Sequence, residues 1–129
     1  MSYHINKVIR SESFETAKTL VTDALRSEGF GVLTEIDIQA TMKKKLDKDY
    51  PPFFILGACN PQFADKILSI DPNMSALLPC NVTVRALEND QIEVSAIDPV
   101  AAIATVGGNN ITALATEVRE KLKRVLEAL

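Results

Sequence analysis

The sequence has few of the residues that mark a metal centre or a disulfide scaffold. Its 129 residues include no tryptophan, one histidine and two cysteines, and aromatic residues make up 5%. A structural zinc site uses four Cys or His ligands, and Cys59, Cys80 and His4 are too few to complete one. Two cysteines without a secretion signal are typical of free thiols in a reducing compartment. The sequence therefore predicts a cytoplasmic protein.

A net positive charge and long apolar segments are also absent. The chain carries 14 Lys and Arg against 17 Asp and Glu, which gives a net charge of −3, whereas nucleic-acid-binding domains are usually basic. No apolar run approaches the roughly 18 residues that a membrane span requires. Residues 1–7 lack the apolar segment of a signal peptide. These absences argue against a general nucleic-acid binder and against a membrane partner.

The residue pattern predicts one α+β domain over residues 1–129. A chain of this length buries roughly two-thirds of its unfolded surface, which is enough to fold without a metal or a disulfide. Strands are expected at residues 4–10, 30–38, 53–58, 80–87 and 91–97, and the main helices at 14–28, 39–46, from 61, and 111–129. The order is β-α-β-(short α)-β-α-β-β-α. It predicts an antiparallel sheet of about five strands with the long N- and C-terminal helices packed on one face.

Residues 30–38 show a two-residue period. One face carries Val32, Thr34, Ile36 and Ile38, and the other carries Leu33, Glu35 and Asp37. A strand with one buried and one wet face is typical of an antiparallel sheet. We expect the wet face to carry Glu35 and Asp37, where paired carboxylates can act as acid and base or bind a cation. The alternative is that both are ordinary solvated charges.

Both cysteines are followed by asparagine and lie beside a proline, in Cys59-Asn60-Pro61 and Pro79-Cys80-Asn81. Asn60 and Pro61 fit the N-cap and first residue of a helix. Cys59 then precedes a helix N-terminus, which stabilises a thiolate and favours nucleophilic, redox or metal-ligand chemistry. The alternative is a small buried residue at the end of a core strand.

Cys80 shares its predicted strand face with Val82 and Val84, which favours a core position. The spacing of the two cysteines permits a disulfide without predicting one. Asn60 and Asn81 either orient a ligand or, for Asn60, cap a helix. Asp98 is expected to be an N-cap before Pro99. Lys43, Lys44 and Lys45 either contact an anion or form a solvated helix face.

The sequence also resembles a known family. The segments that carry the resemblance are Gly29–Ile38, Lys43–Leu46, Gly57–Pro61, Leu78–Val82 and Ala96–Pro99, in this order. They are similar to those of the family catalogued as domain of unknown function 302, over nearly the whole chain. The resemblance implies a compact α+β fold grouped with the TATA-binding-protein-like folds, with helices on one face of an antiparallel sheet. It implies no activity or cofactor, and it does not imply DNA binding. It directs attention to Cys59, Asn60, Pro61, Pro79, Cys80, Asn81 and Asp98.

Three functions remain open from the sequence. The first is a small-ligand-binding or thiol-redox module centred on Cys59 and Cys80, whose ligand is a small anion, a sulfur species or a soft metal. The second is a non-enzymatic interaction protein, a homodimer, because no residue is nominated as a general base. The third is a small enzyme that uses Glu35, Asp37 or Asp98 as acid or base.

Overall fold

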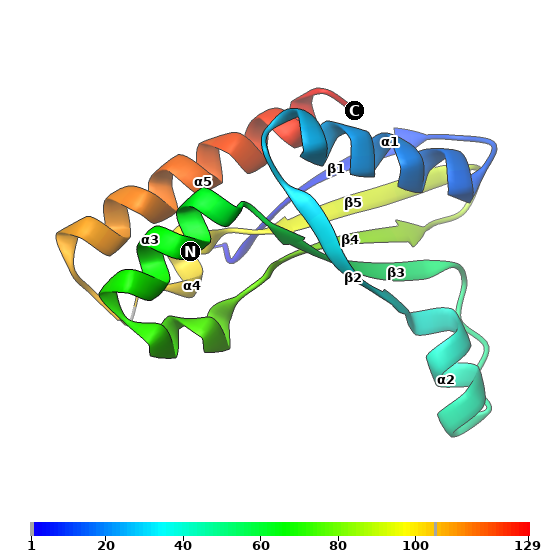
Figure 1. Cartoon of the computed structure of the whole chain (residues 1–129). Coiled ribbons are helices and arrows are strands. Elements are labelled where there is room, and N and C mark those ends of the chain that lie inside the picture. The colour runs from blue at the N-terminus through cyan, green and yellow to red at the C-terminus, as the bar shows by residue number, and fades with distance from the viewer. Residues whose placement is uncertain (1, 105) are drawn as a thin grey trace.

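The computed structural model describes residues 2–104 and 106–129, which form one layer of helices on one layer of sheet (Figure 1). The described strands form a five-stranded antiparallel sheet in the order β1-β5-β4-β3-β2. The strands are β1 (His4–Arg10), β2 (Gly31–Asp37), β3 (Phe53–Cys59), β4 (Cys80–Ala86) and β5 (Gln91–Ile97). The helices are α1 (Phe14–Ser27), α2 (Ile38–Leu46), α3 (Pro61–Ile70), η1 (Pro72–Leu77), α4 (Pro99–Ala102) and α5 (Asn109–Glu127). The predicted fold class and element order are confirmed.

Local sequence chemistry explains where several elements begin and turn. The side chain of Ser13 accepts a hydrogen bond from the Thr16 N–H at the start of α1, as an N-cap should. Asp71 accepts one from the Asn73 N–H at the start of η1. Between β4 and β5, Asn89 and Asp90 have φ values of 57° and 59°. These left-handed conformations suit the tight turn of a β-hairpin.

The core lies between the sheet and the two long helices α1 and α5 (Figure 1). Its fully buried side chains come from both layers and are Val21, Leu25, Leu56, Val82, Val84, Val94, Leu122 and Val125. Each such side chain contributes about 1.5–3 kcal/mol when it leaves water. Burial of the apolar stripes of α1 and α5 therefore fixes both helices on the same face of the sheet.

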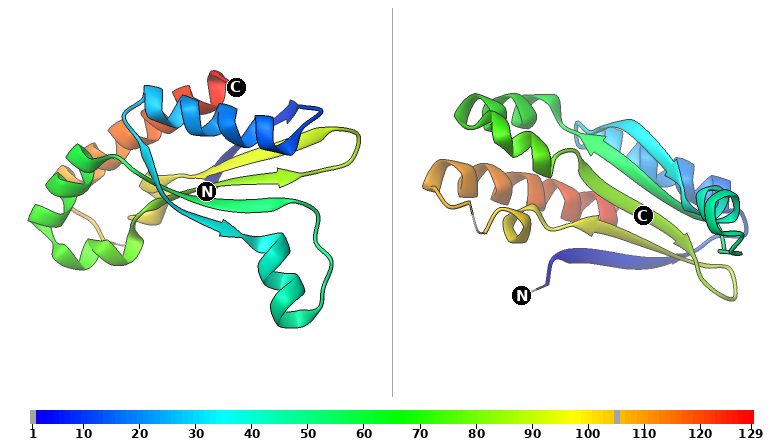
Figure 2. Two further views of the ribbon diagram at one scale, coloured as in Figure 1. Left: turned by 45° about the vertical axis from the view of Figure 1, so that its right-hand side comes forward. Right: turned by 90° about the horizontal axis from the view of Figure 1, so that it is seen from below.

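The opposite face of the sheet has no helix over it in the part of the chain that the structure describes, as the view from below shows (Figure 2). Helix α2 projects on this side, beyond the end of the sheet (Figures 1 and 2). Asp37 caps α2 by accepting a hydrogen bond from the Ala40 N–H, at 2.9 Å. Helix α2 contains no buried residue. It is therefore an arm held at its base.

The predicted faces of β2 are wrong. Residues 32 and 34 both pair with consecutive residues of β3, since Val32 lies opposite Ala58 and Thr34 opposite Gly57. Leu33 is the extra residue of this bulge, and an extra residue reverses the faces of all that follow. Ile36 consequently lies on the uncovered face with 46% of its surface exposed. Glu35 instead lies on the helix side, where it forms an ion pair with Lys18 of α1.

Among the described residues, no helix is long and apolar enough to cross a membrane.

Candidate functional site

A cavity of about 60 Å³ lies where the sheet ends meet α3, η1, α4 and α5. Its apolar wall includes Phe30, Phe63, Ile67, Met74, Ile103 and Ala115. These side chains are buried, and four of them form a small core cluster separate from the main core. None of the described residues that line the cavity is charged. The cavity therefore suits an apolar group of a few non-hydrogen atoms better than a small anion.

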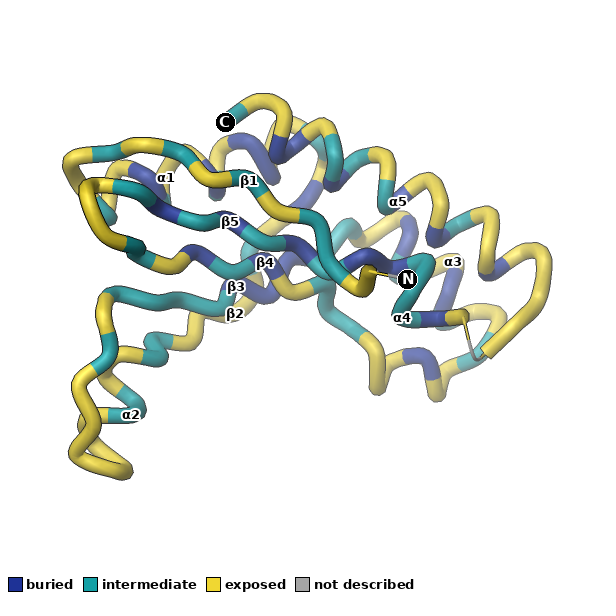
Figure 3. The backbone as a smooth tube through the Cα atoms, turned by 180° about the vertical axis from the view of Figure 1, so that it is seen from behind, coloured by how far each residue is buried: buried dark blue, intermediate teal, exposed yellow. Residues whose placement is uncertain are grey.

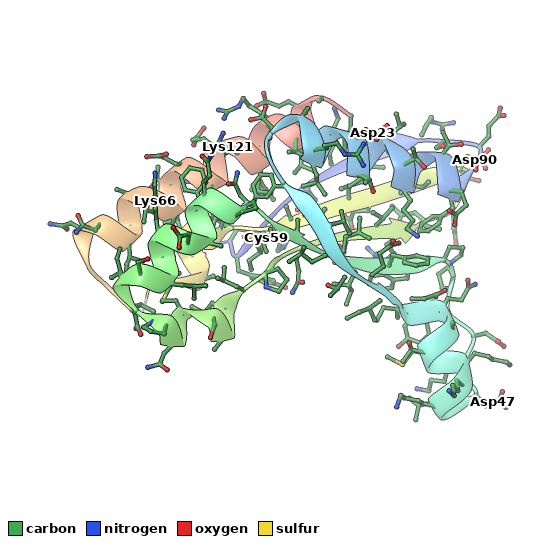
Figure 4. The ribbon with its side chains drawn as sticks, in the orientation of Figure 1. Asp23, Asp47, Cys59, Lys66, Asp90 and Lys121 are labelled. Atoms are coloured by element: carbon green, nitrogen blue, oxygen red, sulfur yellow. The ribbon has the colours of Figure 1, made fainter. Side chains whose placement is uncertain are left out.

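The sheet register brings both cysteines to this cavity. Cys80 is the first residue of β4 and pairs with Ala58, the neighbour of Cys59 in β3. Cys59 is the last residue of β3, just before α3 begins (Figure 4). Both cysteines are half-buried, neither is in a disulfide, and both line the cavity. Two residues far apart in sequence thus line the same cavity.

The core position predicted for Cys80 is confirmed, because its side chain packs against the main core beside Val82. Burial raises the pKa of the Cys80 thiol to about 11, and the nearby Cys59 adds a smaller increase. Burial disfavours the charged thiolate, and so does a second negative charge close by. Cys80 is therefore a neutral thiol near pH 7. Activation of Cys59 by the N-terminus of α3 stays a prediction.

Asn60 is the N-cap residue of α3, but the predicted capping hydrogen bond is absent. Its side-chain amide instead donates to the carbonyl of Glu28, at 3.4 Å, and so ties the end of β3 to the end of α1. Pro61 is the exposed first residue of α3. Of the predicted site residues, the cavity brings together Cys59, Asn60, Pro79 and Cys80.

Asn81 lies outside the cavity, exposed on the uncovered face of the sheet. Asp98 is buried and caps α4, as predicted, by accepting hydrogen bonds from the N–H groups of Val100 and Ala101. Its other oxygen lies 3.3 Å from Nε of Arg119 on α5. Asp98 thus holds α4, whose Pro99 and Ala102 line the cavity, against α5.

The weaker candidates lie away from the cavity. Glu35 pairs with Lys18, and Asp37 caps α2. Lys43 forms ion pairs with Asp47 and Asp49, at 3.0 and 3.1 Å. Asp37 and the three lysines, of which Lys44 and Lys45 are exposed, belong to the arm or its base. The tip of the arm at Asp47 lies far from Cys59 (Figure 4). The roles of the weaker candidates in acid–base chemistry or anion binding stay predictions.

Gly57 is a residue that the sequence reading missed. A Cβ atom at this position would collide with Oγ1 of Thr34 and would lie 2.8 Å from Cγ of Pro79. Thr34 and Pro79 therefore close over the backbone of Gly57, one residue from Ala58 on the cavity wall. Only glycine fits there, because the side chains of Thr34 and Pro79 occupy the space that a Cβ atom would need.

Over residues 2–104 and 106–129, no three His, Cys, Asp or Glu side chains gather closely enough to hold an ion. Sulfur is nevertheless concentrated at the cavity, since the thioether of Met74 joins the two thiols in its lining. Sulfur groups are polarisable and prefer soft or apolar partners.

Together the fold and the cavity define a small α+β domain that is covered by helices on one sheet face and carries two thiols at an apolar cavity. The sequence profile described as "Domain of unknown function DUF302" matches residues 6–129. The chain belongs to this family. Its structure is similar to one titled "Crystal structure of uncharacterized conserved protein DUF302 from Bacillus stearothermophilus", with a TM-score of 0.89 and 22% sequence identity. That match covers 99% of this chain and 98% of the other. No curated protein matches the sequence.

Proposed function

We propose that this domain binds a small apolar or sulfur-containing ligand in the cavity beside Cys59 and Cys80. The observation that carries the proposal is the placement of two cysteines in the lining of a mostly apolar cavity without charged residues. Ligand pockets are typically apolar with a few polar groups that orient the ligand. The cavity is small, so the ligand has few non-hydrogen atoms or inserts only one end. Two free thiols fit a reducing compartment, and we place the protein in the cytoplasm.

The test uses dimethyl sulfide and xenon as probes, with inorganic phosphate as the anionic comparison. Both apolar probes should shift the methyl NMR signals of Ile67, Ile103 and Ala115 in a saturable way, whereas phosphate should not. Ala64→Leu fills the cavity from α3 and should abolish these shifts. Ala113→Leu adds the same atoms on the exposed side of α5 and should leave them unchanged. Absence of saturable shifts, or unchanged binding in Ala64→Leu, would refute the proposal.

The pairing of β3 with β4 favours a second function, a reversible thiol pair. Strands about 4.8 Å apart with a rise of about 3.4 Å put residues offset by one position about 6 Å apart between Cα atoms. That distance lies within the range of disulfides. Positions offset by one face opposite sides of a sheet, so closure requires the end of β3 at Cys59 to turn its side chain toward Cys80. A small-molecule disulfide would be the oxidant: one protein thiolate displaces one of its thiols, and the second protein thiol displaces the other. The products are a Cys59–Cys80 disulfide and two free small-molecule thiols.

Incubation with oxidised glutathione tests this second function. Wild-type protein should lose two hydrogen atoms by mass spectrometry and lose reactivity toward alkylating reagents at both cysteines. Cys59→Ser and Cys80→Ser should form only the mixed disulfide with glutathione. If the wild-type protein ends as the mixed disulfide with glutathione, the reversible thiol pair is contradicted. The proposal of ligand binding in the cavity is not affected by that result.

A further inference from the structure

The uncovered face of the sheet, here called the open face, carries apolar and polar side chains in rows that cross the strands. One row crosses all five strands and consists of Ile36, Ile55, Thr83, Ser95 and Asn6. The next row contains Phe53, Arg85, Glu93 and Val8. Ile36 and Val8 expose 46% and 48% of their surface. Figure 3 shows this side of the molecule with half-buried and exposed residues along the strands. Val8 on β1 and the apolar residues of β2 and β3 therefore flank a polar centre on β4 and β5.

Four polar side chains of the open face already interact with one another. Arg85 forms an ion pair with Glu93, and the amide of Asn6 donates to the other oxygen of Glu93, at 3.2 Å. Nδ1 of His4 lies 2.6 Å from the side-chain oxygen of Asn6. Burial of a polar group is costly only when it loses its partners. A protein surface can therefore cover the centre of this face without leaving Arg85 or Glu93 unpaired.

Helix α2 completes the surface as an arm. Ile38, Met42 and Leu46 recur every four residues and so form one apolar row along the helix. Leu46, at the tip, is 61% exposed. With 9 residues, α2 is about 14 Å long. Two sheets packed face to face are about 10 Å apart, so the arm is long enough to reach a second sheet laid on the open face.

We propose that the open face and the apolar row of α2 form the interface of a symmetric homodimer. Five strands of seven residues span about 24 by 23 Å, so two copies bury about 1,000 Å² before the arms contribute. The sheet faces alone fall short of the roughly 1,200 Å² at which specific interfaces begin, so the dimer depends on the area that the two arms add. In a two-fold dimer each α2 packs on its partner, and the same patch serves both chains. The near balance of charge on the open face favours a second copy over nucleic acid, which requires a basic surface.

One exposed isoleucine and one exposed leucine allow a matched test of the dimer. Ile36 lies on the open face with 46% exposure, and Leu20 lies on the outer side of α1 with 48% exposure. Wild-type protein should have a dimer mass by sedimentation equilibrium. Ile36→Glu should raise the dimer dissociation constant by about 100-fold or more, since each dimer would bury two unpaired carboxylates. Leu20→Glu, an equal chemical change, should leave the constant unchanged.

The arm has its own pair of variants. Leu46→Glu should weaken the dimer, whereas Lys44→Glu, which reverses a charge on another side of α2, should not. Circular dichroism and thermal unfolding check that each variant folds. A monomeric wild-type protein at high-micromolar concentration refutes the proposal. So does a dimer that Ile36→Glu and Leu46→Glu leave intact, or a monomer that binds a random-sequence oligonucleotide through this face.

Discussion

The ionisation of Cys80 provides a quantitative prediction. Its pKa of about 11 lies above the ordinary thiol value of 9.0, with burial as the main cause and Cys59 as the lesser one. The difference of two units means about 100-fold less thiolate than an ordinary cysteine at any pH below 9. In Cys59→Ser the lesser cause is removed, so the pKa of Cys80 should fall only part of the way toward 9.0.

Alkylation with iodoacetamide against pH measures this in native Cys59→Ser protein, where Cys80 is the remaining thiol. The access of iodoacetamide to Cys80 changes the alkylation rate at every pH. The midpoint of the pH profile, which reports the pKa of the thiol, is therefore the quantity to compare. We expect a midpoint well above that of the same protein unfolded in urea. A native midpoint at or below the unfolded one would refute the account of a buried, neutral thiol at the cavity.

The same pKa shift predicts a loss of stability at alkaline pH. The folded pKa is raised, so the stabilisation by neutral Cys80 is complete below about pH 9 and is lost as pH rises toward about 11. Two pKa units correspond to roughly 2–3 kcal/mol. The free energy of unfolding of Cys59→Ser, minus that of Cys59→Ser with Cys80→Ala, should fall over this window by up to that amount. A flat difference would contradict the prediction, because lysine and tyrosine titrations cancel between the two proteins.

Substitutions at Gly57, Asp98 and Asn60, each with a comparison variant, test the packing around the site. Gly57→Ala should cost roughly 1–3 kcal/mol in urea unfolding, and adding Thr34→Ala should recover part of it, because one of the two clashes is removed. Asp98→Ala should cost more than Asp98→Asn, which keeps the cap of α4 but loses the charge that faces Arg119; equal losses would contradict the cap. Asn60→Ala should cost less than the ~1 kcal/mol of an ordinary N-cap, whereas Asp71→Ala should cost that amount.

The features that could be predicted from the sequence depend on residues close together in the chain. Asp98 caps its helix as expected, and Ser13 and Asp71 cap theirs in the same way, because an N-cap needs only its own side chain and the N–H groups two or three residues on. The apolar stripe of α5 is likewise read from one segment. Asn60 shows the limit of this reasoning, since its side chain bonds to Glu28 of another element instead.

The features that were missed depend on the pairing of distant strands. The bulge at Leu33 exists only because Val32 and Thr34 pair with consecutive residues of β3, and nothing within residues 30–38 encodes that register. The meeting of Cys59 and Cys80 at one cavity likewise follows from the Ala58–Cys80 pair in the β3–β4 ladder.

Gly57 connects the bulge at Leu33 with the cavity. It has an ordinary strand conformation, so no turn signal marks it, and its lack of a side chain matters only because Thr34 and Pro79 pack over it. Thr34 faces Gly57 as a result of the bulge at Leu33, and Pro79 precedes Cys80 at the cavity. The bulge therefore affects the site as well as the sheet. A variant that deletes Leu33 should remove the bulge but keep the pairs Val32–Ala58 and Thr34–Gly57, so Glu35 should stay on the helix side. The methyl NMR signals of Ile36 and Ile67 should then stay close to those of the wild-type protein, and large shifts at both would contradict this register.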